Sequence, residues 1–263
     1  MKSKITLLQI LFLCVFVGCG IYAAKYNYDK NKTEKEIAAL KNEIQAAENA
    51  AEETNGQAQE PTETETWEAD GILTRYHSLY DANSDMAGWI KIDGTAIDYP
   101  VMYNGESNAY YLHRNFEKQH SSAAIPFLDY QCDRTGNCDN MIIYAHNMRN
   151  GTMFRSLLLF DDAEFERENS IIQFDTLYNR CKYEVFAAFY TAVGSKDEFR
   201  YYEFINAETE DDYNAFIDEC ISHSLYDTGI RPSYGELLLT LSTCSYNTNN
   251  ERFVVVARMT EKI

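Results

Sequence analysis

The sequence has few basic residues. Its 263 residues include 23 Lys and Arg against 41 Asp and Glu, which gives a formal net charge of −18. A nucleic-acid-binding surface needs clustered positive charge to neutralise phosphates, so this composition argues against that class of protein. Only 4 Pro and 12 Gly are present, which excludes collagen-like and proline-rich chains. The remaining composition, with 45% hydrophobic residues, is sufficient for a packed core.

Several common catalytic and binding motifs are also missing. The chain has no glycine-rich phosphate loop and no Gly-x-Ser-x-Gly nucleophile elbow. Cys132 and Cys138 lie in one short loop, but no second ligand pair follows at the spacing of a zinc site. These two cysteines are compatible with a disulfide and, equally, with two free thiols. We therefore expect neither a metal nor another cofactor.

One long uncharged segment lies near the N-terminus. Residues 5–24 carry no charge and follow Lys2 and Lys4. About 20 helical residues span a hydrocarbon core of roughly 30 Å, and preceding lysines favour a cytoplasmic N-terminus. A retained signal anchor is the favoured interpretation, and the alternatives are a cleaved secretory signal and a lipoprotein signal lipidated at Cys19. All three place the rest of the chain outside the cytoplasm.

The composition predicts four regions. Residues 1–4 form a cytoplasmic N-terminus, residues 5–24 a transmembrane anchor and residues 25–66 a polar stalk and linker. An apolar stripe of about three turns in the stalk is too short to predict a coiled coil. Residues 67–263 hold 31 of the 41 acidic residues and most of the aromatic ones, so they are predicted to form the packed domain.

The packed domain is predicted to be mostly β. Short apolar runs separated by turn signals predict eight strands, at residues 89–92, 97–101, 124–128, 141–145, 170–174, 183–191, 236–242 and 253–259. Such a series favours a closed or nearly closed barrel. Helices are predicted at 70–82, 153–160 and 209–225, with Asp70 and Thr209 as candidate N-caps. The expected fold class is therefore α+β, an eight-stranded barrel with peripheral helices.

Three side chains that could take part in catalysis lie at the ends of predicted strands. Cys244 ends an apolar run and precedes a polar loop, and His146 follows another apolar run. Arg252 opens the last strand eight residues after Cys244, so a strand–loop–strand connection brings the two side by side. Nearby imidazole and guanidinium groups favour the thiolate that nucleophilic chemistry requires. Taken singly, an inert buried thiol is the favoured interpretation of Cys244, and Arg252 is equally compatible with an exposed strand end.

In this order, the three residues resemble those of the sortases, cysteine transpeptidases of Gram-positive cell surfaces. The family motif Thr-Leu-x-Thr-Cys is matched by residues 240–244, the family His by His146 and the family Arg by Arg252. Residues 88–101 and the helix predicted at 209–225 resemble class B members. The resemblance covers about residues 68–263 and implies an eight-stranded sortase barrel.

The resemblance also implies a reaction. Cys244 is expected to attack a sorting-signal carbonyl after Thr, with His146 exchanging protons with the leaving and incoming amines. Arg252 is expected to stabilise the oxyanion or position the peptide. Similar matching implies substrate contacts for Asn108, Leu112, Tyr144, Ser242 and Ser245, although Leu112 and Tyr144 are also compatible with purely core roles.

The implied partners are surface proteins with a C-terminal sorting signal, an amine of a peptidoglycan precursor or cross-bridge, and the cell membrane. The chain is expected to cross the membrane once, with its catalytic domain outside the cell and facing the wall. A cysteine peptidase that only hydrolyses, a pilin-polymerising sortase and a non-catalytic surface adhesin are the alternatives. The exact sorting motif is not predicted.

Overall fold

The computed structural model describes residues 2–54, 66–194, 198–245 and 250–263. It divides into two compact units, Met1–Lys41 and Asn42–Ile263. The division falls inside the segment predicted as stalk, so residues 42–54 group with the larger unit. Residues 55–65 of the predicted linker lie outside the described residues.

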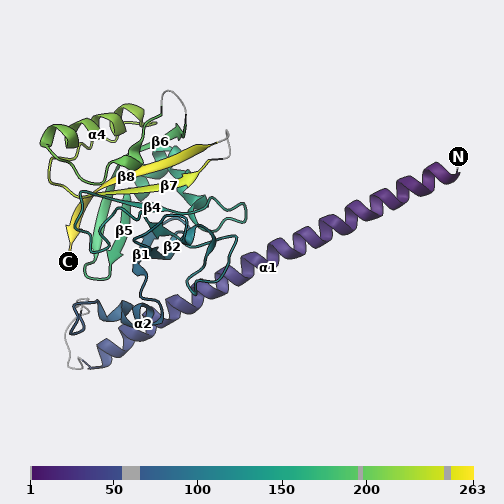
Figure 1. Cartoon of the computed structure of the whole chain (residues 1–263), viewed down its shortest axis with the longest axis horizontal. Coiled ribbons are helices and arrows are strands. Elements are labelled where there is room, and N and C mark those ends of the chain that lie inside the picture. Colours follow the sequence, from purple (N-terminus) through teal and green to yellow (C-terminus); the bar gives the residue numbers. More distant parts are fainter. Residues whose placement is uncertain (1, 55–65, 195–197, 246–249) are drawn as a thin grey trace. The chain divides into compact units, whose positions relative to one another are not determined.

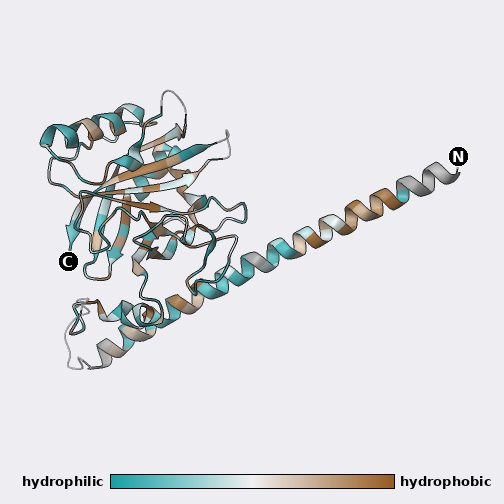
Figure 2. Ribbon diagram, viewed as in Figure 1, coloured by the Kyte–Doolittle hydropathy of each residue, from teal (hydrophilic) through white to brown (hydrophobic). Residues whose placement is uncertain are grey.

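The first helix, α1 (Lys2–Thr54), is continuous through the predicted anchor and most of the predicted stalk. Within it, an 18-residue window reaches a mean hydropathy of 1.6 and is not buried inside the protein. Figure 2 shows brown, apolar turns giving way to mainly teal turns along this helix. By length and composition, it is the one helix among the described residues that could cross a membrane.

The larger unit is built on eight strands. They are β1 (Met86–Ile92), β2 (Asp98–Tyr103), β3 (Phe127–Leu128), β4 (Asn140–Tyr144), β5 (Ile171–Thr176), β6 (Cys181–Ala192), β7 (Leu238–Cys244) and β8 (Glu251–Lys262). They close into one barrel in the order β1-β2-β3-β4-β7-β8-β6-β5 (Figure 1). The pairs β2–β3 and β4–β7 are parallel, and the other pairs are antiparallel. The predicted eight-stranded α+β barrel is confirmed.

Helix α4 (Glu210–His223) covers the outside of the barrel beside β6 and β8 (Figure 1). Its N-terminus is capped as predicted, because the Thr209 side chain accepts from the Asp212 amide and the Asp212 side chain accepts from the Thr209 amide. Its apolar stripe, which includes Phe216 and Cys220, packs on Leu238 of β7 and on valines of β8. Strand β7 is therefore buried on both faces, and only its last residue is partly accessible.

Three local predictions differ from the structure. Helix α2 (Thr74–Ala82) begins after Leu73, so the prediction of Asp70 as its N-cap was wrong. The Asp70 carboxylate instead accepts from the Ile72 amide, 3.1 Å away, in the turn before the helix. Strand β3 has only two residues, because Pro126 has no amide hydrogen and Ala124 adopts a positive φ of 55°.

The third difference concerns the helix predicted at 153–160. These residues form a 3₁₀ helix, η2 (Phe154–Asp161), and a separate helix α3 (Ala163–Asn169) follows it. The Asp162 side chain accepts from the Glu164 amide and so caps α3. Asp161 is therefore the last residue of η2, and Asp162 begins the second helix as its N-cap.

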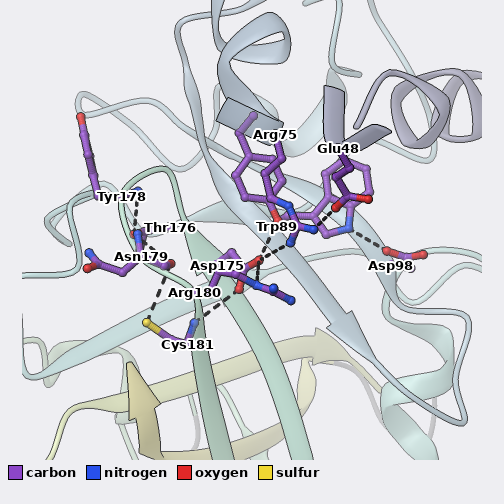
Figure 3. Close-up of polar contacts among 11 residues, drawn as sticks. Glu48, Arg75, Trp89, Asp98, Asp175, Thr176, Tyr178, Asn179, Arg180 and Cys181 are labelled. Atoms are coloured by element: carbon purple, nitrogen blue, oxygen red, sulfur yellow. Dashed lines mark hydrogen bonds and ion pairs between the residues drawn. The ribbon is translucent and has the colours of Figure 1, made fainter. Parts of the chain in front are cut away.

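A buried carboxylate connects the helices that precede β1 to the barrel (Figure 3). The Tyr76 hydroxyl of α2 donates to Asp175 of β5 over 2.7 Å, and Arg75 and Arg180 lie 3.7 and 3.6 Å from the same oxygen. Arg75 also pairs with Glu48 near the end of α1. Burial raises the pKa of Asp175, and the Tyr76 hydrogen bond and the two arginines oppose that change. The cluster thus holds α2 against β5.

Candidate active site

Cys244 is the last residue of β7, the strand between β4 and β8. Because β7 is parallel to β4 and antiparallel to β8, the end of β4 and the start of β8 lie on either side of it. Its thiol is half-buried, whereas the other cysteines described in the larger unit are buried: Cys132, Cys138, Cys181 and Cys220. Among the cysteines described in the larger unit, Cys244 is therefore the one with a partly accessible thiol.

Arg252 lies directly opposite Cys244 in the register of β7 and β8. The next pair along is hydrogen-bonded, since the Ser245 amide donates to the Glu251 carbonyl over 2.9 Å. Pairs alternate along an antiparallel ladder, so Cys244 and Arg252 form a non-hydrogen-bonded pair, in which Cα atoms approach to about 4.5 Å and side chains lie closest. The geometry therefore brings the predicted guanidinium beside the predicted thiol.

His146 lies two residues beyond β4. The parallel register of β4 and β7, continued past the end of β4, places it level with Cys244. Both neighbours of His146 bind β7, because the Ala145 amide donates to the Ser242 carbonyl over 3.2 Å and Asn147 Nδ2 donates to the Cys244 carbonyl over 2.8 Å. The backbone around His146 is thus fixed to the strand that ends in Cys244.

Two contacts from the short 3₁₀ helix η1 (Tyr111–His113) orient the His146 ring. Its Nε2 lies 2.8 Å from the Leu112 carbonyl oxygen. A carbonyl only accepts, so Nε2 carries a hydrogen and Nδ1 is the atom that can gain or lose a proton. The ring also stacks on His113, with centroids 6.1 Å apart and planes inclined by 23°.

A tyrosine outside the barrel approaches Cys244 and Arg252. Tyr201 begins the 3₁₀ helix η3 (Tyr201–Glu203), and its hydroxyl lies 2.6 Å from Ser242 Oγ. Burial raises the pKa of Tyr201 to about 12. The Ser242 hydrogen bond and the charge of Arg252 act to lower this pKa, and Cys244 acts to raise it, so both Arg252 and Cys244 lie near the phenol. Tyr201 is therefore a neutral phenol beside the thiol and the guanidinium at physiological pH.

Two of the predicted substrate-contact residues meet at a buried carboxylate. Asp129, which follows β3, is 2% exposed. Its Oδ2 accepts from Asn108 Nδ2 over 2.8 Å and from the Tyr144 hydroxyl over 3.0 Å. Burial and the neighbouring Asp129 raise the pKa of Tyr144, so its hydroxyl stays protonated and remains a donor. The structure thus fixes Asn108 and Tyr144 relative to each other.

The other predicted substrate-contact residues have different environments. The Leu112 side chain is 38% exposed, next to His146. Ser242 and Ser245 are only 1% and 6% exposed, and the hydroxyl of Ser242 is engaged by Tyr201. Leu112 is therefore partly exposed in the structure, whereas both serines are buried. Residues 246–249, which follow Ser245, lie outside the described residues.

Three residues of this site were not anticipated from the sequence: Asp129, Asn147 and Tyr201. Asp129 has the same signal that identified Cys244 and His146, a polar residue immediately after an apolar strand. Asn147 directly follows His146 and shares that signal. Tyr201 has none, because it lies in the long connection between β6 and β7 and reaches Ser242 only through the tertiary fold.

The arrangement suits nucleophilic catalysis. The strand registers place Cys244, with its half-buried thiol, between the positions of His146 and Arg252. A thiol, an imidazole and a guanidinium are the groups required to form a thiolate, exchange a proton and stabilise an oxyanion. Within the described ranges, no group of three or more His, Cys, Asp or Glu side chains is arranged to hold a metal ion. Cys132 and Cys138 are both free thiols.

Comparisons with known proteins identify a family and several relatives. A family model described as sortase domain matches residues 90–260. Sortase B of Staphylococcus aureus is 29% identical over 262 residues, 98% of each chain, and sortase B of Listeria monocytogenes is 30% identical over 193 residues, 73% of this chain and 76% of that one. A solved S. aureus sortase B–substrate complex superposes with a TM-score of 0.74 and 25% identity, over 89% of this chain and 99% of that chain.

Proposed function

The chain belongs to the sortase family of cysteine transpeptidases and is similar to sortase B, and we propose that it anchors surface proteins to the cell wall. In this proposal it cleaves a C-terminal sorting signal after Thr and joins the acyl group to an amine of peptidoglycan. The observation that supports it most is the position of Cys244 between His146 and Arg252 at three adjoining strand ends.

The first half-reaction forms a thioester. The Cys244 thiolate attacks the carbonyl carbon after Thr, and Arg252 stabilises the negative charge that develops on the oxygen. His146 Nδ1 holds the proton that the Cys244 thiol lost when it became a thiolate, and it gives this proton to the departing amine while Nε2 stays bound to the Leu112 carbonyl. The C–N bond breaks, and the acyl group remains on the Cys244 sulfur.

The second half-reaction transfers that acyl group. The incoming amine attacks the thioester, His146 Nδ1 takes the proton from the amine, and Cys244 leaves as a thiolate. One peptide bond is broken and one amide bond is formed, with no net oxidation. Asn108, Leu112 and Tyr144 are proposed to contact the sorting peptide, and Ser242 and Ser245 to support the site from below.

The N-terminal helix fits a location at the cell surface. Its apolar window is long enough to span a bilayer, and Lys2 and Lys4 precede it. We propose a single-pass membrane protein whose barrel lies outside the cell and faces the wall. Anchoring would hold the enzyme close to translocated substrates and to the precursors of the wall.

Product analysis tests the transpeptidase assignment. The full chain in detergent is incubated with a Thr-containing sorting peptide, with and without a glycine-based amine. A new amide product that increases with amine concentration, at the expense of the free acid, is expected. A free-acid product that stays constant at every amine concentration would assign the chain to the peptidases that only hydrolyse.

The substitution Asp129→Asn is expected to weaken peptide binding. The change replaces the acceptor shared by Asn108 and Tyr144 with an amide whose nitrogen cannot accept their hydrogens. We expect KM for the sorting peptide to rise about 10-fold, equivalent to one charged hydrogen bond, with a smaller change in kcat. Steady-state kinetics on the folded variant measures both.

Asp133→Asn is the matched control for that variant. Asp133 lies in the same loop, but its carboxylate accepts from the amide and the hydroxyl of Thr135, within its own turn. Its KM should stay within about twofold of the original, as expected for a surface substitution. Equal increases in KM for the two variants would show that Asp129 has no special part in peptide binding.

A further inference from the structure

Cys132 and Cys138 converge inside the loop that joins β3 to β4. Each Sγ lies 3.6 Å from the same atom, the carbonyl oxygen of Asn140. The Cys132 sulfur also accepts from the Ile142 amide over 3.4 Å. Both side chains are buried, at 3% and 5% exposure, and their sulfurs are within hydrogen-bonding reach of each other. Two thiols that are six residues apart in sequence therefore lie next to each other inside this loop.

The electrostatics of the pair differ from those of two isolated thiols. The hydrogen bond from Cys132 lowers the pKa of Cys138, and the same interaction together with burial raises the pKa of Cys132. Cys138 is therefore the sulfur that more readily becomes a thiolate. A thiolate beside a second thiol is the combination that thiol–disulfide exchange requires.

The pair is separate from the nucleophile. Asn140, on which both sulfurs converge, pairs with Leu238 at the start of β7, and Cys244 lies six residues further along that strand. At about 3.3 Å per residue, this separation is about 20 Å. Cys181 and Cys220 are also buried, and neither makes a contact with a second sulfur in the described interactions. Cys132 and Cys138 thus have only each other as partners for a bond within the described chain.

We propose that Cys132 and Cys138 form a disulfide that closes the β3–β4 loop when the chain meets a low-molecular-weight disulfide. The Cys138 thiolate attacks the oxidant, releases one thiol and forms a mixed disulfide. The Cys132 sulfur then loses its proton, attacks Cys138 Sγ and releases the second thiol. Two protein thiols are oxidised, and one small disulfide is reduced to two thiols. Exposure to such an oxidant in the cell rests on the extracellular location given under the proposed function. The formation of the disulfide itself does not depend on that location.

The bond would constrain the segment that begins at Asp129. The Cys132 amide already donates to the Asp129 carbonyl over 3.0 Å, and the Asp129 carboxylate holds Asn108 and Tyr144. Closing a loop of seven residues lowers the entropy of the unfolded chain. For a domain of this size, the loop-closure effect corresponds to a rise in Tm of about 5 °C.

Peptide mapping tests the proposal without any activity assay. The full-length Cys244→Ala chain, which lacks the accessible thiol, is reduced, exposed to oxidised glutathione in detergent, alkylated after unfolding and digested with trypsin. Cleavage at Arg134 separates the two cysteines, so the disulfide joins peptides 119–134 and 135–149. We expect this cross-linked pair in monomeric protein, with Cys181 and Cys220 alkylated, together with the rise in Tm.

The variant Cys132→Ala in the same background is the matched control, and its Tm should not respond to the oxidant. The proposal would be overturned if both peptides were recovered in alkylated form from the Cys244→Ala chain, with Cys132 and Cys138 intact, after treatment with excess oxidised glutathione. A cross-link that involves Cys181 or Cys220 instead would also overturn it. Because the readout is the mass of two peptides, this outcome is distinct from a failure of the transpeptidase assignment.

Discussion

Replacing Cys244 by Ala is expected to abolish both cleavage of the sorting peptide and formation of the amide product. The thiol is the proposed nucleophile, and nothing else described in the site supplies one. Removing the nucleophile of a covalent mechanism lowers kcat by about 10⁴-fold or more. The strand itself should be unaffected, because Cys244 is the partly accessible last residue of β7. Initial rates, with the amount of folded enzyme measured in parallel, test this expectation.

Cys220→Ala provides the comparison. Its thiol is fully buried in the cluster beneath α4, away from β7's end. This variant should lose about 1 kcal/mol of stability because it removes a buried atom, and it should keep its activity per folded molecule. Full activity of Cys244→Ala, or equal losses in the two variants, would remove Cys244 from the mechanism.

Replacing Arg252 by Ala is expected to lower kcat by about 10²- to 10³-fold, the range found when a donor to a developing oxyanion is removed. KM should change less, because the charge on the oxygen exists mainly in the transition state. Arg252→Lys should recover only part of the loss, since an ammonium lacks the planar fork of donors of a guanidinium. The split between kcat and KM distinguishes this role from simple peptide binding.

Arg258→Ala is the matched control on the same strand. Arg258 lies six residues further along β8, where it pairs with Glu184 over 3.0 Å and Glu236 over 3.3 Å. Its loss should affect stability slightly and leave kcat within about twofold, because partly exposed ion pairs contribute little. A similar fall in kcat for both variants would indicate that loss of either arginine from β8 disturbs the barrel, and it would argue against oxyanion stabilisation by Arg252.

The strands and the three strand-end residues could be predicted because their signals are local. Apolar runs with turns between them locate the strands, and Cys244, His146 and Arg252 each lie next to such a run. Their meeting follows from the pairing order of β4, β7 and β8, which the sequence alone does not contain. The family resemblance implied that the three residues act together in an eight-stranded barrel, but it did not predict that pairing order.

The features that were missed depend on contacts between distant segments. Tyr201 contacts Ser242, 41 residues away, and Asp129 joins Asn108 to Tyr144 across 21 and 15 residues. The orientation of His146 depends on a carbonyl 34 residues earlier. The wrong N-cap at Asp70 had a different cause, because Asp side chains also stabilise turns just before a helix.

The most direct test of the mechanism is the intact mass of the full-length enzyme mixed with a sorting peptide in the absence of an amine. The proposed mechanism predicts a mass increase equal to the acyl fragment that ends in Thr, located on Cys244 by peptide mapping. It also predicts that this adduct disappears when the amine is added and that the amide product forms in equal amount. An adduct on another residue, or turnover of the peptide with Cys244 replaced by Ala, would contradict it.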